Sequence, residues 1–384
     1  MSCVPIVFSV SIGQGHNQAA RALKKELDAQ GFANVEVIDT LHWLNPLLHH
    51  SVSMSYWWIL RYRPSLWGKL FYKSYQSNKM LRSYEKTIRI FLGRVEQFIE
   101  EKQPPFIIST HPWATWLVAL AKEKRGWEVP LYSVITDFQL HPAYVHKQVT
   151  SYFTMDEAAN QFAQIYGESP SKFHQTGIPF PSNPPNHLES HTFRLRQNIP
   201  KHHAVVLIAG GGFGYSSYQT ILIELEKVAK PLTILCMTGH NVSAQKKIQT
   251  IASKHDVRIV SFTDQFVSYL AISDIMITKA GGLTLSEALA CEIPLILYEP
   301  IPGHEEQNAQ VAVKWGMALR AYERNQISAQ VELILSNQMV KERMILAARQ
   351  HKKPNAVEEI VKKIIILQEL LSASVSRAGV VSKG

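Results

Sequence analysis

The sequence predicts an α/β protein of two domains, each a parallel sheet covered by helices, whose sheets face one another across a cleft. The chain has 384 residues, which is longer than the size at which a single hydrophobic core usually keeps growing. Both halves also open alike, since an apolar strand over 4–10 leads to Gly13-Gln14-Gly15 and an apolar strand over 205–209 leads to Gly210-Gly211-Gly212. In both halves, apolar strands then alternate with helix-forming stretches, which is typical of parallel sheets.

The remaining elements follow in order along the chain. Between the halves, Pro179–Asn186 is rich in turn formers and predicts a linker. Residues 340–371 have the spacing of Ile, Val and Leu that predicts helix. The expected strands after the two opening ones are 35–38, 106–109 and 131–135, then 232–236, 257–260, 275–278 and 295–298. We expect an N-terminal domain over 1–180, a linker over 181–200, a C-terminal domain over 201–340 and helices over 341–384, which either pack on the second domain or cross back to the first.

The charge balance favours an anionic partner. The net charge is +9. Between Arg61 and Arg94, nine Lys or Arg residues face a single acid, Glu85, and so predict a local basic face. Such a face suits nucleotides, acidic lipid surfaces or nucleic acid.

Cysteine usage and hydropathy exclude several classes of protein. Cys3, Cys236 and Cys291 are far apart and none forms a C-x-x-C pair, so neither a disulfide framework nor a zinc site is predicted. The N-terminus has no basic region before its apolar run, and no stretch of 18 continuous apolar residues occurs. These features argue against a signal peptide and a membrane span. We expect a cytoplasmic protein whose membrane contact is peripheral.

The most informative stretch runs from Ile277 to Ala290 and continues with Pro302–Ala309. An apolar strand delivers the chain to Gly281-Gly282, where the backbone can approach a diphosphate, and the following helix N-terminus offers free N–H groups and a positive dipole end. Glu287, one turn into that helix, is placed to accept hydrogen bonds from ribose hydroxyls. The alternative is a plain tight turn, because glycines before a helix also serve packing.

His16 is the candidate general base. It follows Gly13-Gln14-Gly15 at a predicted helix N-terminus, where the dipole disfavours the imidazolium and keeps the ring available as a neutral base. A purely structural histidine is the alternative. The same loop begins like the dinucleotide fingerprint G-x-G-x-x-G, but Gln18 replaces its third glycine, which argues against a nicotinamide cofactor.

Asp137 and His111 follow two other buried strands, so both are expected at the cleft. Asp137 either orients His16, takes a proton itself or caps the next turn, and His111 is equally a candidate turn residue. No D-x-D motif occurs in the chain, which counts against a metal-bridged diphosphate. Metal-independent transfer is the natural inference, with leaving-group charge stabilised by the glycine loops at Gly211-Gly212 and Gly281-Gly282.

Aromatic residues overlap the basic run, and ten of them lie between Trp43 and Tyr84. Such a mixture suits the headgroup level of an anionic membrane, where each surface base adds about 1 kcal/mol. Some of these rings are expected in the core of the first domain instead, and nothing resembles a nucleic-acid-binding sheet. The candidates for membrane or acceptor contact are Trp57, Trp58, Trp67, Arg61, Arg63 and Lys69.

Taken together, these motifs resemble the processive diacylglycerol glucosyltransferases and monogalactosyldiacylglycerol synthases, which are similar to glycosyltransferase family 28. The resemblance covers nearly the whole chain and implies the GT-B architecture of two Rossmann-like domains. It rests on Gly13–Asn17, Thr136–Phe138, Thr176–Pro179, the loop at Gly211, Thr278–Glu287 and Pro302–Glu305.

The resemblance implies an inverting, metal-independent transfer of a hexose, glucose rather than galactose, from a UDP-sugar. The implied acceptor is diacylglycerol or a glycosyl-diacylglycerol at the inner membrane surface, with no cofactor beyond the donor and no nucleic-acid partner. His16 would deprotonate the acceptor hydroxyl with support from Asp137. Phe262 would lie against the uracil. The implied donor-binding residues are Gly15, Gly211, Gly212, Phe262, Gly281, Gly282, Thr284, Glu287, Glu305, Gln307 and Asn308, and the last three would contact the hexose.

Two alternatives remain open. A UDP-N-acetylglucosamine 2-epimerase shares the architecture but has no reason for the aromatic and basic region after Trp43. A non-catalytic nucleotide-sugar sensor would keep Glu287 and the glycine loops but have no use for His16. His304 stands where the bacterial diacylglycerol enzymes often carry Gln, and this departure bears on the identity of the sugar rather than on the reaction.

Overall fold

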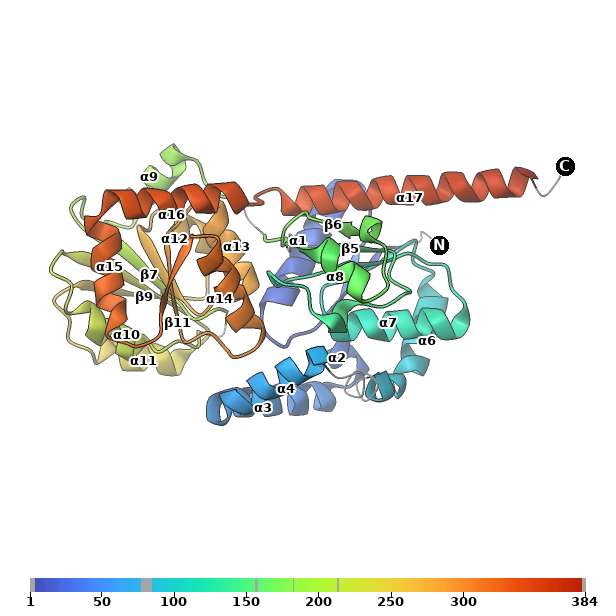
Figure 1. Cartoon of the computed structure of the whole chain (residues 1–384), viewed down its shortest axis with the longest axis horizontal. Helices are drawn as coiled ribbons and strands as arrows, with labels where there is room; N and C mark the ends of the chain where they lie inside the picture. Colours follow the sequence, from blue (N-terminus) through green and yellow to red (C-terminus); the bar gives the residue numbers. More distant parts are fainter. Residues whose placement is uncertain (1–3, 77–84, 156–157, 182, 213, 382–384) are drawn as a thin grey trace.

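The computed structural model describes residues 4–76, 85–155, 158–181, 183–212 and 214–381. Within these residues the strands form two parallel sheets, one in each of two lobes joined side by side (Figure 1). The α/β fold class predicted from the sequence is confirmed. Cys3, Lys79, Arg82, Tyr84, Ser182 and Phe213, which belong to motifs named above, lie outside the described residues.

The N-terminal sheet has the strand order β2-β1-β3-β4-β5-β6 and the C-terminal sheet the order β12-β11-β10-β7-β8-β9. Each order reverses direction beside the opening strand, which is where doubly wound sheets bind ligands at their carboxyl edge. The strands of the first sheet are β1 (Ile6–Ser9), β2 (Glu36–Asp39), β3 (Ile107–Ser109), β4 (Leu131–Val134), β5 (Ser151–Phe153) and β6 (Phe173–His174). Those of the second are β7 (Ala204–Ala209), β8 (Leu232–Gly239), β9 (Asp256–Ser261), β10 (Ile275–Thr278), β11 (Leu295–Tyr298) and β12 (Ala318–Ala321).

Helices connect the strands and cover both faces of each sheet. In the N-terminal lobe they are α1 (Gly15–Ala29), α2 (Thr40–Leu44), α3 (Pro46–Tyr62), α4 (Pro64–Gln76), α6 (Leu92–Lys102), α7 (Pro112–Arg125) and α8 (Ala159–Ile165), with the 3₁₀ turns η1 (Pro142–Tyr144) and η2 (Pro170–Lys172). In the C-terminal half they are α9 (His187–Arg196), α10 (Tyr218–Leu225), α11 (Val242–Gln249), α12 (Phe266–Ala271), α13 (Gly282–Ala290), α14 (His304–Lys314), α15 (Gln326–Ser336), α16 (Gln338–His351) and α17 (Ala356–Val381).

Alternation along each opening strand builds two cores per lobe. In β1, Ile6 and Phe8 are buried toward one face of the sheet with residues of α6 and α7, whereas Val7 is buried toward the other with Leu23 of α1. The period of two places successive side chains on opposite faces. Strand β7 behaves in the same way, with its alternate residues divided between two clusters.

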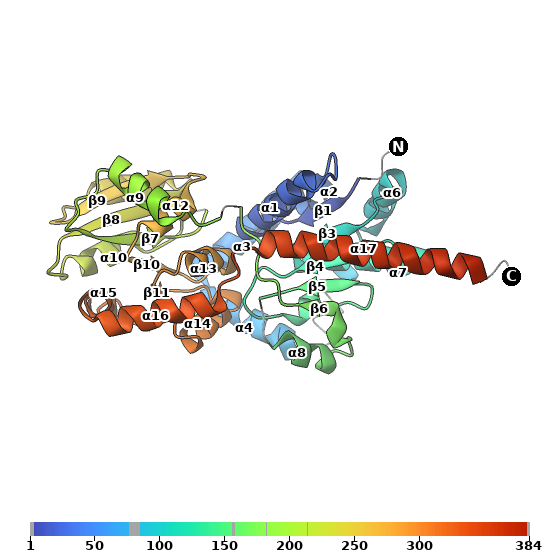
Figure 2. The same cartoon turned by 90° about the horizontal axis from the view of Figure 1, so that it is seen from above.

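The C-terminal helix α17 leaves the second lobe and packs against the first. Ile360, Val361 and Ile364 are fully buried in the same cluster as Val7 and Leu23. Seen from above, α17 lies across the N-terminal sheet and extends beyond it (Figure 2). A side chain at Gly177 would overlap Lys353, so the two stretches of chain that pass between the lobes lie against each other.

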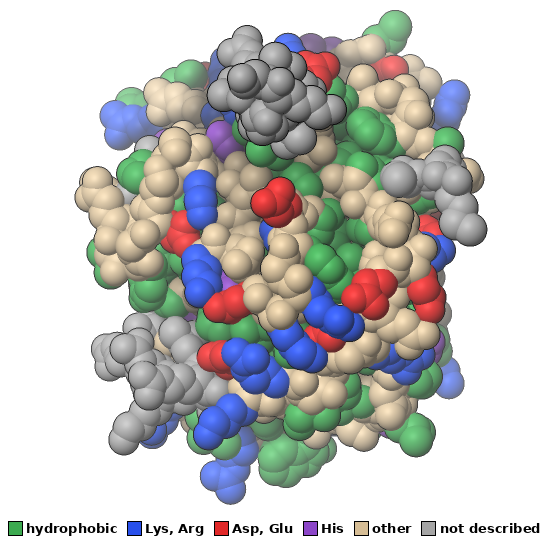
Figure 3. All heavy atoms as spheres, turned by 90° about the vertical axis from the view of Figure 1, so that its right-hand side faces the viewer, with side chains coloured by type: hydrophobic (Ala, Val, Ile, Leu, Met, Phe, Trp, Pro, Cys, Tyr) green, Lys and Arg blue, Asp and Glu red, His purple; other side chains and the backbone are tan. Residues whose placement is uncertain are grey.

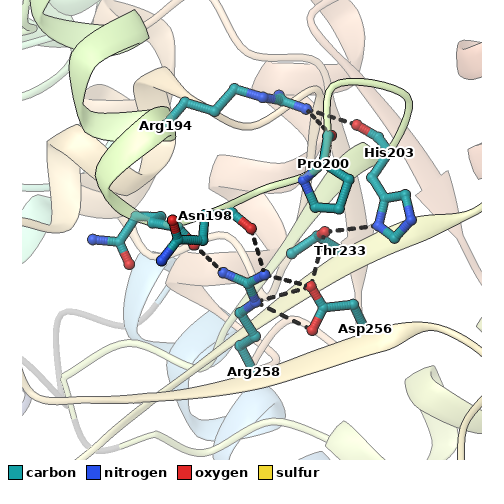
Figure 4. A network of polar contacts seen from close by, with 8 residues as sticks. Arg194, Asn198, Pro200, His203, Thr233, Asp256 and Arg258 are labelled. Atoms are coloured by element: carbon teal, nitrogen blue, oxygen red, sulfur yellow. Dashed lines mark hydrogen bonds and ion pairs between the residues drawn. The ribbon is translucent and has the colours of Figure 1, made fainter.

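The junction between α9 and β7 is fixed by arginine hydrogen bonds (Figure 4). Arg194 donates to the carbonyls of Pro200 (3.3 Å) and His203 (2.7 Å). Arg258 donates to the Asn198 carbonyl (3.1 Å) and pairs with Asp256 at 2.6 Å. These bonds satisfy backbone acceptors in a segment without regular structure, and so set where β7 enters the sheet.

The end of the N-terminal lobe that faces away from its partner mixes charges of both signs. Lys and Arg side chains lie among Asp and Glu over this face (Figure 3). Ion pairs in this lobe include the exposed pair of Lys102 with Glu36 and the pair of exposed Lys124 with buried Glu96. A face of interleaved signs produces little long-range field, so it offers no broad attraction for an anion.

Candidate active site between the two lobes

Two adjacent cavities that share lining residues lie at the facing strand ends of the two lobes. The smaller, of about 160 Å³, lies between the glycine loops of the two lobes. The larger, of about 740 Å³, is bounded mainly by apolar side chains of the N-terminal lobe. The same five residues line both cavities: Ile12, His16, Tyr56, Asp137 and His304. His16 and Asp137, predicted as catalytic, therefore lie where the two cavities meet.

His16 is held in one tautomer by the end of β3. Its Nδ1 lies 2.7 Å from the carbonyl oxygen of Thr110 and 2.8 Å from Oγ1 of Thr136. A carbonyl oxygen can only accept, so Nδ1 carries the proton and donates it. The other ring nitrogen, Nε2, is then left with a lone pair. That is the protonation state a general base requires.

Burial keeps the His16 ring neutral. Removal from water is the largest influence and lowers its pKa, and the charge of nearby His304 acts in the same direction. The Asp137 carboxylate and the hydrogen bond to Thr110 oppose the shift without reversing it. The pKa of His16 therefore lies below its usual value of about 6.5, and the imidazole is available to accept a proton near neutral pH.

Asp137 acts on His16 through its charge and is itself held by the C-terminal lobe. Its Oδ1 accepts a hydrogen bond of 3.1 Å from Nδ2 of Asn308. The next residue, Phe138, donates its backbone N–H to Oδ1 of Asn308 at 2.8 Å. The loop after β4 is thus bonded to α14 across the cleft.

The glycine loops meet at close range. A side chain at Gly282, the first residue of α13, would overlap the carbonyl oxygen of Thr136 in the other lobe. A side chain at Gly212 would lie 2.5 Å from Cγ of Gln14, again across the cleft. Only residues without a side chain permit these two approaches. The helix N-termini of α1 and α13 consequently face the same small cavity, where their free N–H groups attract an anion.

Most of the implied donor-binding residues gather around this small cavity. It is lined by Gly15, Gly211, Gly212, Gly281, Gly282, Thr284 and Glu305. Gln307 instead lines the larger cavity. Asn308 is completely buried, and its amide makes hydrogen bonds to the protein.

Glu287 and Phe262 lie outside the linings of both cavities. Glu287 is buried in α13, and burial raises the pKa of its carboxyl to about 8. Phe262 follows β9, is 42% exposed and stacks on His240 with ring centroids 4.4 Å apart. The stack forms a flat apolar edge at the carboxyl end of the C-terminal sheet.

Comparisons with known proteins agree with this geometry. Residues 16–180 match the family model described as monogalactosyldiacylglycerol (MGDG) synthase, and residues 205–360 match that of the glycosyltransferase family 28 C-terminal domain. The chain is therefore a glycosyltransferase that joins a region matching MGDG synthase to a C-terminal domain of glycosyltransferase family 28. Its relatives include the processive diacylglycerol beta-glucosyltransferases of Bacillus pumilus, 26% identical over 93% of this chain and 94% of the relative, and of Bacillus subtilis, 26% identical over 96% of each.

Solved structures place the glycosyltransferase within the GT-B fold. The crystal structure of Acinetobacter baumannii MurG has a TM-score of 0.60 at 16% identity, covering 94% of this chain and 99% of that one. A UDP-GlcNAc 2-epimerase from Neisseria meningitidis has a TM-score of 0.59 at 15% identity with the same coverage. At such identities the likeness shows the fold and does not separate transfer from epimerisation.

Helices α3 and α4 of the glycosyltransferase form the wall of the larger cavity. Tyr56, Ile59, Trp67, Leu70 and Phe71 line it, so the aromatic region contributes the site and not only a surface. Sequence reasoning missed Tyr56, which reaches both cavities and whose pKa is raised by burial and by Glu305 and Asp137. The aromatic cluster was the one signal for it, and that signal did not single out a residue.

The six residues expected at the membrane or acceptor separate into two groups. Trp57 lines the small cavity and contacts Tyr215 of the other lobe, with ring centroids 4.7 Å apart, whereas Trp67 lines the larger cavity. Trp58 is 57% exposed. The basic side chains Arg61, Arg63 and Lys69 are exposed as well. Exposed apolar residues of the same two helices are Leu47, Met54, Tyr62, Leu66, Leu70 and Tyr72.

His111 and His141 complete the polar end of the larger cavity. Each caps a helical turn, since Nδ1 of His111 accepts from Trp113 N–H at 3.1 Å and Nδ1 of His141 accepts from Ala143 N–H at 3.0 Å. Burial lowers the pKa of His111 and brings that of His141 to about 4. Both rings are therefore neutral with the proton on Nε2, which in His141 lies 2.9 Å from Oγ of Ser74. The capping bond of His111 is consistent with the turn role considered for it.

Neither a metal-binding cluster nor a membrane-spanning helix occurs among the described residues. Among them, no cluster of three or more His, Cys, Asp and Glu side chains is arranged to hold a metal ion. In the same part of the chain, no helix combines the length and apolarity needed to cross a membrane.

Proposed function

We propose that this glycosyltransferase moves a hexose from a UDP-sugar to diacylglycerol or a glycosyl-diacylglycerol, with inversion and without a metal or other cofactor. One observation carries the proposal: a small polar cavity walled by glycine loops opens into a large apolar cavity at His16 and Asp137. A sugar nucleotide and a lipid would meet at a neutral imidazole. Neither alternative from the sequence, epimerase or sensor, has a use for the apolar cavity.

The donor is assigned to the small cavity by its charge preference. The N-terminus of α13 and the glycine backbones present N–H groups to it, and such groups stabilise a diphosphate. The nucleoside would extend beyond the lining of the small cavity, where Glu287 would accept from the ribose and Phe262 would stack on the uracil. Glu305, whose Oε2 already accepts from Ile301 N–H at 2.8 Å, turns its other oxygen toward Gly281 and would meet the hexose.

The acceptor is assigned to the large cavity by its lining. The wall is built from apolar and aromatic side chains, with polar groups such as His16, Asp137 and Gln307 gathered where the donor enters. A diacylglycerol has that distribution, since it joins one free hydroxyl to long apolar chains. Each buried CH₂ contributes roughly 0.8 kcal/mol, so a cavity of this type favours a lipid over a polar acceptor.

These positions support the following reaction. Nε2 of His16 takes the proton of the acceptor hydroxyl while the oxygen attacks the anomeric carbon and the bond to the diphosphate breaks. The electron pair of that bond leaves with UDP, whose added charge the α13 N-terminus and glycine N–H groups stabilise in place of a metal. Attack opposite the leaving group turns an α-linked donor into a β-glycoside.

Delivery of the lipid is assigned to the outer face of α3 and α4. Trp58, Tyr62 and Leu66 are exposed there beside Arg61 and Arg63. Apolar side chains beside cations suit the inner, anionic face of a membrane, where each surface base contributes about 1 kcal/mol. The same helices wall the cavity from inside, so a lipid would pass from the bilayer to His16 along a single pair of helices.

The test is transfer of radiolabel from UDP-glucose, and in parallel from UDP-galactose, to diacylglycerol in anionic vesicles with EDTA present. A labelled β-glycolipid formed from UDP-glucose is the expected result. Galactose transfer would reverse the donor preference, which rests on the names of the relatives and on the resemblance. Loss of activity in EDTA would reject metal independence. Formation of UDP-N-acetylmannosamine from UDP-N-acetylglucosamine would replace the proposal by the epimerase. Binding of the UDP-sugar without turnover would replace it by the sensor.

A further inference from the structure

The side chain of Asn308 bonds to both sides of the cleft at once. It lies on α14 of the C-terminal lobe and is 0% exposed. Its Oδ1 accepts from Phe138 N–H at 2.8 Å, and its Nδ2 lies 3.1 Å from both Asp137 Oδ1 and the Ala280 carbonyl oxygen. The two N–H donors of the amide and one acceptor site are therefore used by the protein. An amide so occupied has no donor left for a hexose.

The contact on the donor side is with a strained residue. Ala280 has a φ of +109° immediately before Gly281-Gly282, a conformation that residues with a side chain rarely adopt. Such strain persists only where the surroundings impose it, and it is concentrated at ligand sites. By accepting from Asn308, the Ala280 carbonyl is held in the orientation that starts α13 at the small cavity.

The contact on the acceptor side reaches the catalytic base. Asn308 bonds to Asp137 and to the backbone of Phe138, and Thr136, one residue earlier, lies 2.8 Å from Nδ1 of His16 through Oγ1. The Thr136 carbonyl also packs against Gly282. Residues 136–138 are thus held by His16 on one side and by Asn308 and α13 on the other.

We propose that Asn308 is a positioning residue that transmits closure of the donor lobe to Asp137 and His16, and that it does not contact the hexose. The expected effect on kcat rests on the proposed function, whereas the expected coupling of Asn308 to the backbone of Phe138 does not. When a donor draws the glycine loop into place, Ala280 and Asn308 move with it. Asp137 is then brought to the position from which its charge supports the protonated His16 formed in the reaction.

The sharpest variant is Asn308→Asp, because it preserves size and the acceptor for Phe138 while replacing the donor to Asp137 and Ala280 by a carboxylate oxygen. A misplaced catalytic group costs up to about a hundredfold in rate, so we expect kcat to fall by about tenfold to a hundredfold. The fall should be equal with UDP-glucose and UDP-galactose, with the affinity for free UDP changed less than about threefold. A loss confined to one sugar, or seen in KM rather than kcat, would make Asn308 a hexose contact and overturn the inference.

A second measurement does not depend on turnover. Hydrogen exchange at the Phe138 amide reports its bond to Asn308 directly. UDP should slow this exchange in the wild type, Asn308→Ala should remove the effect, and Asn308→Asp should retain part of it. Unchanged protection in Asn308→Ala would overturn the inference. If no acceptor is glycosylated by the wild type, the proposed function fails while this measurement still decides the role of Asn308.

A matched control separates coupling from a general loss of stability. Asn337 caps α16 by accepting from Val340 N–H at 3.2 Å, far along the chain from both glycine loops. Asn337→Ala should lower the melting temperature and leave kcat and the Phe138 exchange with UDP unchanged. If Asn337→Ala reproduces the kinetic loss of Asn308→Asp at equal destabilisation, Asn308 has only a structural role and the inference is rejected.

Discussion

The donor side and the acceptor side of this site are built in different ways. The donor side comes largely from one continuous stretch, β10 through α14, in which strand, glycine turn and helix follow each other. The acceptor side is assembled from α3, α4, α7 and the loop after β4, which are far apart in the sequence. The proposed phosphate site is thus encoded locally in backbone geometry, whereas the proposed lipid cavity depends on how distant segments pack.

The largest expected effect concerns the residue that both sides share. His16→Ala should lower turnover by at least about a hundredfold, the usual scale for a general base. Affinity for UDP should remain near that of the wild type, because the donor is bound mainly by the other lobe. Steady-state kinetics together with calorimetric UDP binding check both statements. A variant with near wild-type turnover would remove His16 from the mechanism and with it the link between the two cavities.

The next effect concerns the contact at which the two sides meet. Gly282→Ala suits the start of a helix, but its methyl group would overlap the Thr136 carbonyl across the cleft, so the closed arrangement should be lost. We expect about a tenfold to a hundredfold loss of kcat, the scale of a misplaced reacting group. Gly93→Ala is the control, since no atom lies within 4 Å of its added side chain. Equal activities of the two variants would contradict a need for this contact.

A smaller effect distinguishes the outer face of the acceptor side. Replacing Arg61 and Lys69 by Gln should weaken binding to anionic vesicles by roughly fivefold per charge, corresponding to about 1 kcal/mol each. Co-sedimentation at increasing salt measures it, and the difference from wild type should shrink as salt screens the charges. The matched control is Lys246→Gln with Lys247→Gln on α11 of the other lobe, where both side chains are exposed. Equal weakening of vesicle binding by both pairs of substitutions would show that α3 and α4 act only through the net charge of the protein.

The last expected effect is on stability, not on turnover or membrane binding, and belongs to the donor side. Burial raises the pKa of Glu287 to about 8 from an ordinary value of 4.5, so the folded state binds a proton that the unfolded state releases. Its contribution to stability is full below pH 4.5 and is lost as pH rises toward 8. Glu287→Gln should therefore gain up to about 3 kcal/mol near pH 7, with a flatter pH dependence of unfolding, while UDP binding weakens. Denaturant unfolding of the wild type and the variant between pH 5 and 9 measures the free energy of unfolding. The same dependence on pH in both proteins would contradict a raised pKa of Glu287.

Local patterns predicted a large part of the fold. The strands around Val7, Val206 and Ile277 were evident as apolar runs before glycine turns, because buried parallel strands are continuously apolar. Strands β5, β6 and β12 were not predicted. They have two to four residues that mix polar and apolar types, so they do not stand out as apolar runs, and pairing with a neighbouring strand makes them strands.

The residues of the candidate site likewise separate into those that local sequence predicts and those that it does not. His16, Asp137 and the glycines could be named from sequence because each follows a strand, and the carboxyl ends of parallel strands share one edge of a sheet. Tyr56 could not be named, since nothing local separates it from Trp57 and Trp58. Trp57 was expected to contact the membrane or the acceptor, and the structure places it in the lining of the small cavity, against Tyr215 of the other lobe.

By itself, the sequence determined the two α/β domains, the glycine turns and the histidine at the start of α1, because these depend on residues close together along the chain. Tertiary structure alone decided that α17 packs on the first lobe, that α3 and α4 enclose an apolar cavity, and that Asn308 bonds to Asp137 and Ala280. The physical reason is that burial and hydrogen bonding between distant segments depend on which surfaces meet. That choice is made by the whole folded chain and leaves no period or spacing in the sequence.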